Sequence, residues 1–208
     1  MLKFRIAQST LKRFFSQIIP EEAQKEADLR KCFTIIQSVE VVAANKRLKI
    51  LQNKIEEHKD KKMLILCNNE EGTSLLKKDL QELFIFPRTL SGASLSMQDN
   101  HIIKNFESKD NGLLIALNNY FKKINLANVS CLINYSIPLT IEEYNEIVLK
   151  YYQDAQKGEM LSFFTTNDDE LADQLILSFI ESHQNIPLSL AEFRRTMIYK
   201  SKTSRKWK

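Results

Sequence analysis

LLIALNNYFKKINLANVSCLINYSIP, residues 113–138, is the stretch that decides the fold. Two apolar runs of strand type, residues 113–117 and 130–135, flank a polar loop that carries the basic pair Lys122 and Lys123. Short continuous apolar runs are typical of strands that are buried on both faces, as they are in a parallel sheet. The two runs have the spacing of a nucleotide-binding sheet, so we expect the loop to lie at the strand ends, where such sheets place their ligands.

Apolar, β-branched runs alternate with helical patterns along the rest of the chain. Strands are predicted at residues 33–42, 63–67, 113–117, 130–135 and 160–165, with a weaker candidate at 84–90. Helices are predicted at residues 45–58, 74–83, 99–106, 140–153 and 168–183. Thr140, followed three residues later by Glu143, predicts a capping box for the fourth helix. This alternation predicts crossover connections, and therefore an α/β three-layer domain with a mostly parallel sheet flanked by helices.

With 208 residues, of which 43% are hydrophobic, the chain is long enough for one domain with short extensions. No apolar run reaches the roughly 18 residues of a transmembrane helix, so we expect no membrane span. Cys32, Cys67 and Cys131 are widely spaced in apolar segments, which favours buried, reduced thiols in a cytosolic or nuclear protein. The formal net charge of +4 is too small to indicate a nucleic-acid partner by itself.

Positive charge gathers at both ends of the chain. Residues 1–31 form a basic extension, for which the sequence leaves open an amphipathic helix packed on the domain and a mitochondrial presequence. Residues 32–193 form the predicted domain, and residues 194–208 form a basic tail without an acidic residue. The tail could neutralise phosphates and stack Tyr199 and Trp207 on bases, and the alternative is a solvated, poorly ordered end.

The sequence gives no sign of a complete catalytic site. Its four glycines, Gly72, Gly92, Gly112 and Gly158, are too far apart to form a loop that cradles phosphates before a helix. The chain is therefore not a self-sufficient NTPase, although it is compatible with the second lobe of a two-lobed one. The histidines fall in separate regions and are expected to be ordinary surface or partly buried residues. We expect no catalytic residue, metal site or cofactor.

From about residue 32 to residue 193 the chain resembles the C-terminal RecA-like lobe of DEAD-box RNA helicases. MLILCNN at 63–69 is similar to the family's motif IV, LSG at 90–92 to its L-H-G, and LINYSIP at 132–138 to its V-I-N-Y-D-x-P. Gln98 opens the family's Q-x-x-R element, in which His101 stands for the arginine. The resemblance implies a RecA-like fold and RNA contacts at the strand ends. The RNA-binding candidates are Asn69, Gly92, Gln98, His101, Lys122 and Lys123.

The chain departs from the family at the residues that serve ATP hydrolysis. In the family's motif V, T-D-x-x-x-R-G-x-D, the replacements are Leu117, Asn118, Lys122, Lys123 and Asn125. Motif VI, H-R-x-G-R-x-x-R, aligns with residues 146–153, where Lys150 and Gln153 replace the arginine fingers. Neither an ammonium nor an amide reproduces the paired hydrogen bonds of a guanidinium. Loss of such a finger typically costs on the order of a thousandfold in rate, so we expect no ATP hydrolysis from this lobe.

With catalysis excluded, the sequence predicts a binding function, for which there are two hypotheses. The first is an RNA-binding scaffold that uses the strand-end residues. The second is self-association or binding of a protein partner, motivated by the apolar residues that occupy the motif VI segment: Ile147, Val148, Leu149, Tyr151 and Tyr152. These residues cannot all face the core from one helix, so we expect part of them to be exposed. A conventional helicase lobe, which would need ATP and a separate first lobe, is the alternative.

The pattern of departures is similar to that of the Tudor-domain helicase-like proteins of the piRNA pathway, such as the insect Yb group. This resemblance implies a lobe of a longer protein that acts in transposon-silencing RNA processing. It also implies a cytoplasmic location, in RNA granules, in preference to a mitochondrial one.

Overall fold

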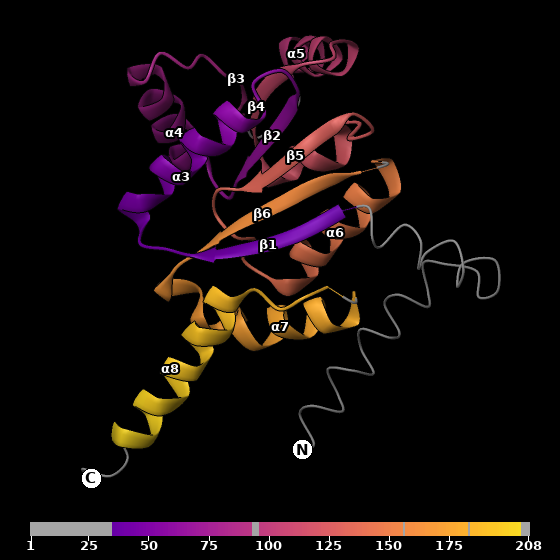
Figure 1. Cartoon of the computed structure of the whole chain (residues 1–208). Coiled ribbons are helices and arrows are strands. Elements are labelled where there is room, and N and C mark those ends of the chain that lie inside the picture. The colour runs from indigo at the N-terminus through magenta and orange to yellow at the C-terminus, as the bar shows by residue number, and fades with distance from the viewer. Residues whose placement is uncertain (1–34, 93–95, 156, 183, 205–208) are drawn as a thin grey trace, which may run out of the picture.

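One six-stranded sheet forms the centre of the molecule. The computed structural model describes residues 35–92, 96–155, 157–182 and 184–204. The strands are β1 (Ile35–Val41), β2 (Lys62–Cys67), β3 (Arg88–Leu90), β4 (Gly112–Leu117), β5 (Val129–Asn134) and β6 (Gly158–Phe164). They lie in the order β1-β6-β5-β2-β4-β3, and each pair of neighbours is parallel (Figure 1). The parallel sheet predicted from the sequence is confirmed.

Helices cover both faces of the sheet. They are α3 (Ala44–Glu57), α4 (Glu70–Glu82), α5 (Met97–Ser108), α6 (Ile141–Asp154), α7 (Ala172–Glu181) and α8 (Leu188–Ser204), with 3-10 helices η1 (Asn118–Lys123) and η2 (Thr166–Leu171). Buried side chains of α3 and α4 pack on one face, and those of α5, α6, α7 and the start of α8 pack on the other. The later part of α8 projects away from the sheet (Figure 1). These layers form the predicted three-layer α/β domain.

Strand β2 is buried along its whole length. It lies between β4 and β5, and its side chains point alternately into the two cores. This position explains the uninterrupted apolar run from Met63 to Cys67, because a central parallel strand has no face in contact with solvent. Its first residue, Lys62, is buried as well, and its ammonium donates to the Glu107 carbonyl oxygen at 2.7 Å.

Polar caps set the starts of the helices that follow the strands. The Asn69 side chain accepts from the Gly72 backbone N–H at 2.7 Å where α4 begins. The Thr140 hydroxyl accepts from the Glu143 backbone N–H at 3.2 Å, so α6 begins where the sequence predicts. These caps satisfy N–H groups that have no partner within the helix.

The weaker strand candidate and the last predicted helix differ from expectation. Only residues 88–90 of the run 84–90 form a strand, because Phe84 adopts a left-handed turn with φ 61° and its side chain is exposed. The predicted helix at 168–183 is divided into η2 and α7. Asp168, expected in the first turn of that helix, lies in the first turn of η2, where its carboxylate accepts from the Thr165 backbone N–H at 2.7 Å.

The predicted basic tail is helical as far as Ser204. Helix α8 runs across the predicted domain boundary between residues 193 and 194. Arg194 forms a two-pronged ion pair with Asp173 of α7, which fixes the start of the predicted tail to the domain. The predicted N-terminal extension and Cys32 lie outside the described residues. Cys67 and Cys131 are buried and free, as predicted.

The apolar residues of the motif VI segment are buried except for Leu149, which is partly buried, so the prediction that part of them is exposed holds for Leu149 alone. Ile147, Val148, Tyr151 and Tyr152 are each at most 9% exposed. The two tyrosines reach polar partners inside the domain: the Tyr151 hydroxyl donates to the Val129 carbonyl oxygen at 2.8 Å, and the Tyr152 hydroxyl accepts from Gln37 at 3.0 Å. With the sheet on one side and α7 on another, α6 has a wider buried face than a surface helix.

Within the described residues, no helix has the length and apolarity that crossing a membrane requires.

Gly158 begins β6 at a point where a larger residue has no room. A Cβ atom there would lie 2.0 Å from the Tyr151 hydroxyl and 3.2 Å from the Ser130 carbonyl oxygen. We expect Gly158→Ala to lower the free energy of unfolding by about 1–3 kcal/mol through overpacking. Urea unfolding measures this, with the exposed Glu40→Ala in β1 as a control that should change stability by less than about 0.5 kcal/mol. Equal stability of the two variants would contradict the packing at Gly158.

Candidate nucleic-acid interface

The carboxyl ends of the strands meet along one edge of the sheet, because all neighbouring strands are parallel. The segments that leave this edge are residues 68–69 after β2, 91–92 after β3, 118–123 after β4, 135–138 after β5 and 165–168 after β6. Open α/β sheets bind their ligands outside such an edge. Most of the residues predicted from the sequence to contact RNA lie in these segments.

The RNA-binding candidates surround the ends of β2, β3 and β4. Asn69 caps α4, and Gly92 follows β3. The remaining four are exposed: Gln98 and His101 in the first turns of α5, and Lys122 and Lys123 at the end of η1. The structure thus brings the candidates to neighbouring positions at one edge, as the sequence predicts.

Tyr120 connects two of these segments. Its hydroxyl donates to the Gly92 carbonyl oxygen at 2.9 Å, which ties η1 to the turn after β3. Asp99 lies 3.5 Å from the same hydroxyl, and the hydrogen bonds from Ser96 lower the pKa of Asp99. Burial, together with this carboxylate, raises the pKa of Tyr120, so its hydroxyl remains a hydrogen-bond donor. Lys122 and Lys123 therefore extend from an anchored segment.

Lys122 has a carboxylate partner that the sequence analysis did not identify. Its ammonium lies 2.6 Å from the Glu146 carboxylate of α6, and both side chains are partly exposed. By the resemblance described above, Lys122 stands at a motif V position and Glu146 at the histidine position of motif VI. Substituted residues of two motifs thus pair with each other, and the pair reduces the positive charge that Lys122 presents. Lys123 lies over the Tyr120 ring, 5.8 Å from its centroid.

Asn118 joins the ends of three strands. Its side-chain amide donates to the Asn68 side-chain oxygen at 2.8 Å, and the Asn68 amide donates to the Ile137 carbonyl oxygen at 2.7 Å. The chain of bonds connects the segments after β4, β2 and β5. The neighbouring Leu117 is buried at the end of β4. Two positions of the predicted altered ATP site therefore face the interior of the domain.

The other three positions of that predicted site lie elsewhere. The Lys150 ammonium pairs with Asp154 at 2.5 Å, and Asp154 also accepts from the Leu126 backbone N–H at 3.1 Å, just before β5 begins. Gln153 is exposed on the same turn of α6. The Asn125 side chain accepts from the Ala127 backbone N–H at 2.9 Å. These residues lie near the amino end of β5, whereas Leu117 and Asn118 lie at the carboxyl end of β4.

A cavity of about 540 Å³ opens at the same carboxyl edge, between the ends of β1, β2, β5 and β6. Arg47 of α3 lines it, donates to the Tyr135 carbonyl oxygen at 2.8 Å, and lies 5.0 Å from the centroid of the Tyr135 ring. Asp168 also lines the cavity, but its carboxylate is occupied in capping η2. The cavity is therefore lined by one cation, one carboxylate and neutral groups.

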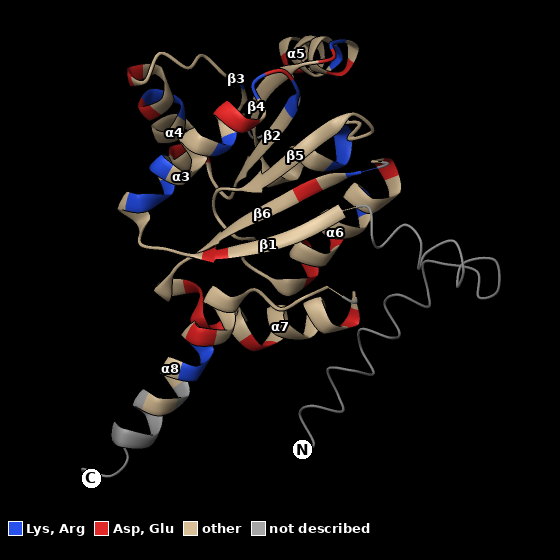
Figure 2. Cartoon of the chain, in the orientation of Figure 1, with Lys and Arg blue, Asp and Glu red and all other residues tan. Residues whose placement is uncertain are grey.

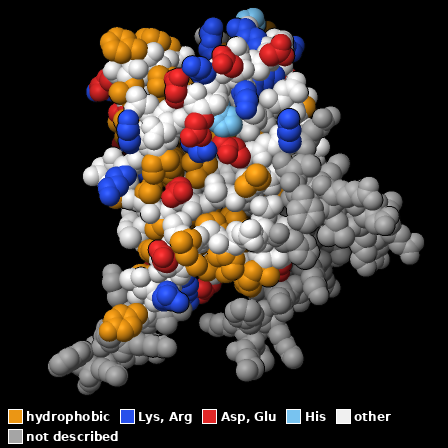
Figure 3. All heavy atoms as spheres, in the orientation of Figure 1, with side chains coloured by type: hydrophobic (Ala, Val, Ile, Leu, Met, Phe, Trp, Pro, Cys, Tyr) orange, Lys and Arg blue, Asp and Glu red, His pale blue; other side chains and the backbone are white. Residues whose placement is uncertain are grey.

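Charge is dispersed over the described surface. Lys and Arg occur together with Asp and Glu on α3, α5 and α8 (Figure 2). Acidic and basic side chains are also interspersed over the upper half of the face in Figure 3. This face therefore carries no broad basic patch within the part of the chain that the structure describes.

Comparison with known proteins identifies the family. Residues 46–153, just over half of the chain, match the model of the helicase conserved C-terminal domain. The chain belongs to this family. The match begins in α3 and ends in α6, so it includes the β2 to β5 strand ends described above.

Relatives of known function are DEAD-box RNA helicases. The chain is 24% identical to DEAD-box ATP-dependent RNA helicase 21 of Oryza sativa subsp. japonica over 157 residues, which are 76% of this chain and 21% of the relative. It is 30% identical to the ATP-dependent RNA helicase DBP3 of Mycosarcoma maydis over 102 residues, which are 49% of this chain and 17% of the relative. The chain thus spans about a fifth of the length of these relatives and is a distant homologue of their C-terminal lobe.

Solved structures show the same fold. The RNA helicase Prp28 from Chaetomium thermophilum bound to ADP superposes with a TM-score of 0.67 at 19% identity, over 76% of this chain and 39% of that one. The E. coli DEAD-box protein SrmB bound to the regulator RraA gives a TM-score of 0.59 at 17% identity, over 69% of this chain and 84% of that one. The sheet and its helices are therefore RecA-like, as the sequence predicts.

The sequence did not predict one cluster of polar residues. His58, expected to be an ordinary histidine, converges with Cys131 and Glu159 at the opposite edge of the sheet. The three residues come from separate elements and are far apart in the chain, so no local spacing could reveal them. Only the pairing of β5 with β6 brings Cys131 opposite Glu159.

The hydrogen bonds of Asn118 predict a structural role. We expect Asn118→Ala to lower the free energy of unfolding by about 1 kcal/mol, because Asn68 loses its donor, and to leave RNA affinity unchanged. Chemical denaturation and an RNA-binding titration measure the two effects. Gln98→Ala, at an exposed position of α5, is the control for stability. A fall in RNA affinity with unchanged stability would show instead that Asn118 contacts the ligand.

Proposed function

We propose that this helicase C-terminal lobe is an RNA-binding scaffold that does not support ATP hydrolysis. The observation that supports RNA binding most directly is the exposed pair Lys122 and Lys123, held by Tyr120 beside Gly92 and the start of α5. The curated relatives are named as RNA helicases, which favours RNA over other polyanions.

The proposed contacts are to the phosphate backbone. Lysine ammonium groups neutralise phosphates without reading bases, so binding should depend strongly on salt and weakly on sequence. The ion pair between Lys122 and Glu146 opposes RNA binding, because it must break before the Lys122 ammonium can pair with a phosphate alone. Lys123 contributes a second cation one residue away.

Several features support the absence of ATP hydrolysis. Leu117 has no hydroxyl to offer, and the Asn118 amide is used within the domain. Lys150, which replaces an arginine finger, is paired with Asp154. A lysine held by a neighbouring carboxylate cannot supply the bidentate contact that stabilises a transferring phosphoryl group. The proposal therefore includes no enzymatic activity and no nucleotide cofactor for this lobe.

The cellular setting is part of the proposal. The substitutions in motifs V and VI resemble those of Tudor-domain helicase-like proteins of the piRNA pathway. We place the protein on this ground in cytoplasmic RNA granules, as an RNA-binding component of transposon silencing. Self-association through α6 is not part of the proposal, because Ile147, Val148, Tyr151 and Tyr152 are buried.

The lysine pair is tested by charge reversal. Lys122→Glu with Lys123→Glu should weaken binding to single-stranded RNA at least tenfold in low salt, and should reduce the salt slope by about 0.7 for each phosphate that is no longer neutralised. Glu146→Gln should have the opposite effect and strengthen binding, since it frees Lys122. Fluorescence anisotropy across a salt series measures both variants beside the unmodified chain.

A second lysine pair provides the matched control. Lys77 and Lys78 are adjacent and exposed on α4, two turns from the strand ends, so reversing both makes the same change in net charge. This control should lose far less affinity than the variant at Lys122 and Lys123. Equal losses would mean that RNA responds only to net charge, and would remove the two lysines from the site.

The alternative is the second lobe of an ATP-dependent RNA helicase that needs a first lobe. The names of the curated relatives favour it. To distinguish the two, this lobe is fused to the first lobe of a DEAD-box helicase in place of that enzyme's own second lobe. We expect the fusion to bind RNA but to show no ATP hydrolysis stimulated by RNA, whereas the intact helicase hydrolyses ATP. Stimulated hydrolysis by the fusion would overturn the proposal and establish the alternative.

A further inference from the structure

Three residues that can bind a metal ion converge at the amino ends of β5 and β6. His58 follows α3, Cys131 lies in β5 and Glu159 lies in β6. The two strand residues are direct neighbours across the parallel pair. One ligand atom from each residue lies within 4.8 Å of the others. The cluster is at the edge of the sheet opposite the proposed RNA site, so the proposed function does not account for it.

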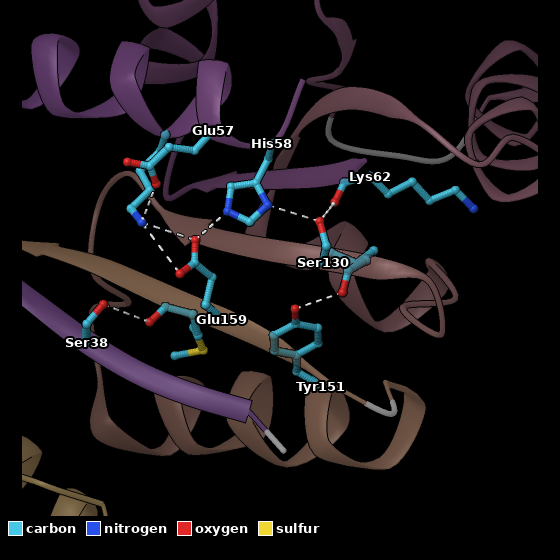
Figure 4. Close-up of polar contacts among 10 residues, drawn as sticks. Ser38, Glu57, His58, Lys62, Ser130, Tyr151 and Glu159 are labelled. Atoms are coloured by element: carbon cyan, nitrogen blue, oxygen red, sulfur yellow. Dashed lines mark hydrogen bonds and ion pairs between the residues drawn. The ribbon is translucent and has the colours of Figure 1, made fainter. Parts of the chain in front are cut away.

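The hydrogen bonds around His58 orient its ring for metal binding. The Ser130 hydroxyl has one proton, which it donates to the Lys62 carbonyl oxygen at 2.9 Å. Its oxygen must then accept from His58 Nδ1, which lies 3.2 Å away. His58 Nε2 consequently faces the Glu159 carboxylate, 2.6 Å from Oε1 (Figure 4). Histidine ligands of metals typically donate the other ring N–H to a fixed acceptor in this way.

We propose that His58 Nε2, Cys131 Sγ and the Glu159 carboxylate bind a Zn²⁺ ion. Zinc takes nitrogen, sulfur and oxygen ligands together in tetrahedral sites, and three protein ligands leave its fourth position to water. The site is accessible: the side chains of His58 and Glu159 are 12% and 31% exposed, while Cys131 is buried behind them. The ion would join α3 to β5 and β6.

Small movements would complete the site. Metal–ligand distances of about 2.0–2.3 Å in a tetrahedron place the ligand atoms roughly 3.3–3.7 Å apart. The 2.6 Å contact between His58 and Glu159 would therefore open, and Cys131 Sγ, within 4.8 Å of the other two ligand atoms, would shift to the same spacing. These are changes of about 1 Å, within the range of side-chain rotation.

The Lys54 ammonium competes with the ion for the Glu159 carboxylate, and a proton competes with it for the Cys131 sulfur. The Lys54 ammonium lies 3.2 Å from Glu159, but it also lies 2.8 Å from Glu57, which can retain it when a metal takes the Glu159 carboxylate. Burial raises the pKa of the Cys131 thiol, so the site without metal holds a neutral thiol. The thiol proton and the proton that joins His58 Nε2 to the Glu159 carboxylate at 2.6 Å both pass to the solvent when the ion binds.

The test uses the full chain, freed of metal by a chelator and then titrated with Zn²⁺ in a calorimeter. We expect one ion for each chain and a higher unfolding temperature. Titration with Co²⁺ should give a near-ultraviolet thiolate-to-metal absorption band. Cys131→Ala should lose the band, and Glu159→Gln should weaken binding at least tenfold. Ser130→Ala, which removes the acceptor for His58 Nδ1, should weaken it about 10- to 100-fold.

Matched variants outside the cluster separate this site from other ligands in the chain. Cys67→Ala removes the other buried free cysteine of the described residues, and His101→Asn removes an exposed histidine. Both should bind Zn²⁺ and Co²⁺ as the unmodified chain does. Circular dichroism checks that each variant is folded. If Cys131→Ala does not fold, the Zn²⁺ affinity of Glu159→Gln becomes the deciding measurement. This variant should fold, because the Glu159 side chain is partly exposed and glutamine has nearly the same shape.

Either of two results would overturn the proposal. The first is no saturable uptake of Zn²⁺ by the unmodified chain. The second is uptake that Glu159→Gln leaves unchanged. In both cases the cluster would be an ion-pair network that joins α3 to the sheet without a metal.

Discussion

β2 lies between β4 and β5 and sends its side chains alternately into the two cores of the domain. Its burial on both faces requires helices on both sides of the sheet, and those helices require crossover connections between parallel strands. Parallel pairing in turn places the carboxyl ends of the strands at one edge and the amino ends at the other. The positions of both candidate sites follow from this arrangement.

The two edges differ in chemistry. The carboxyl edge presents short polar segments, an anchored lysine pair and helix starts, which suits a flexible polyanion such as RNA. The amino edge carries His58, Cys131 and Glu159, which suits a compact cation. The sheet lies between the two sites. A metal at the amino edge would therefore act on stability and on the position of α3, without contact with RNA.

Helix α6 contributes mainly to the interior of the domain. Its tyrosines extend inward, where Tyr144 and Tyr152 both meet Gln37 of β1 and Tyr151 meets the start of β5. Each buried hydrogen bond of this kind contributes about 0.5–1.5 kcal/mol net. The helix also presents Glu146 to Lys122, so the charge of the proposed RNA site depends on α6. In our proposal this segment modulates RNA binding and no longer contacts a nucleotide.

The sequence by itself determined the layers, the parallel sheet, most strand and helix positions and the gathering of Asn69, Gly92 and the lysine pair at one edge. These features follow from local periodicity and from the geometry of parallel strands. Only the tertiary structure decided that Ile147, Val148, Tyr151 and Tyr152 are buried, that Lys122 pairs with Glu146 and that His58 meets Cys131 and Glu159. The physical reason is that these contacts join elements far apart in the chain, and their existence depends on strand order and register, which periodicity does not specify.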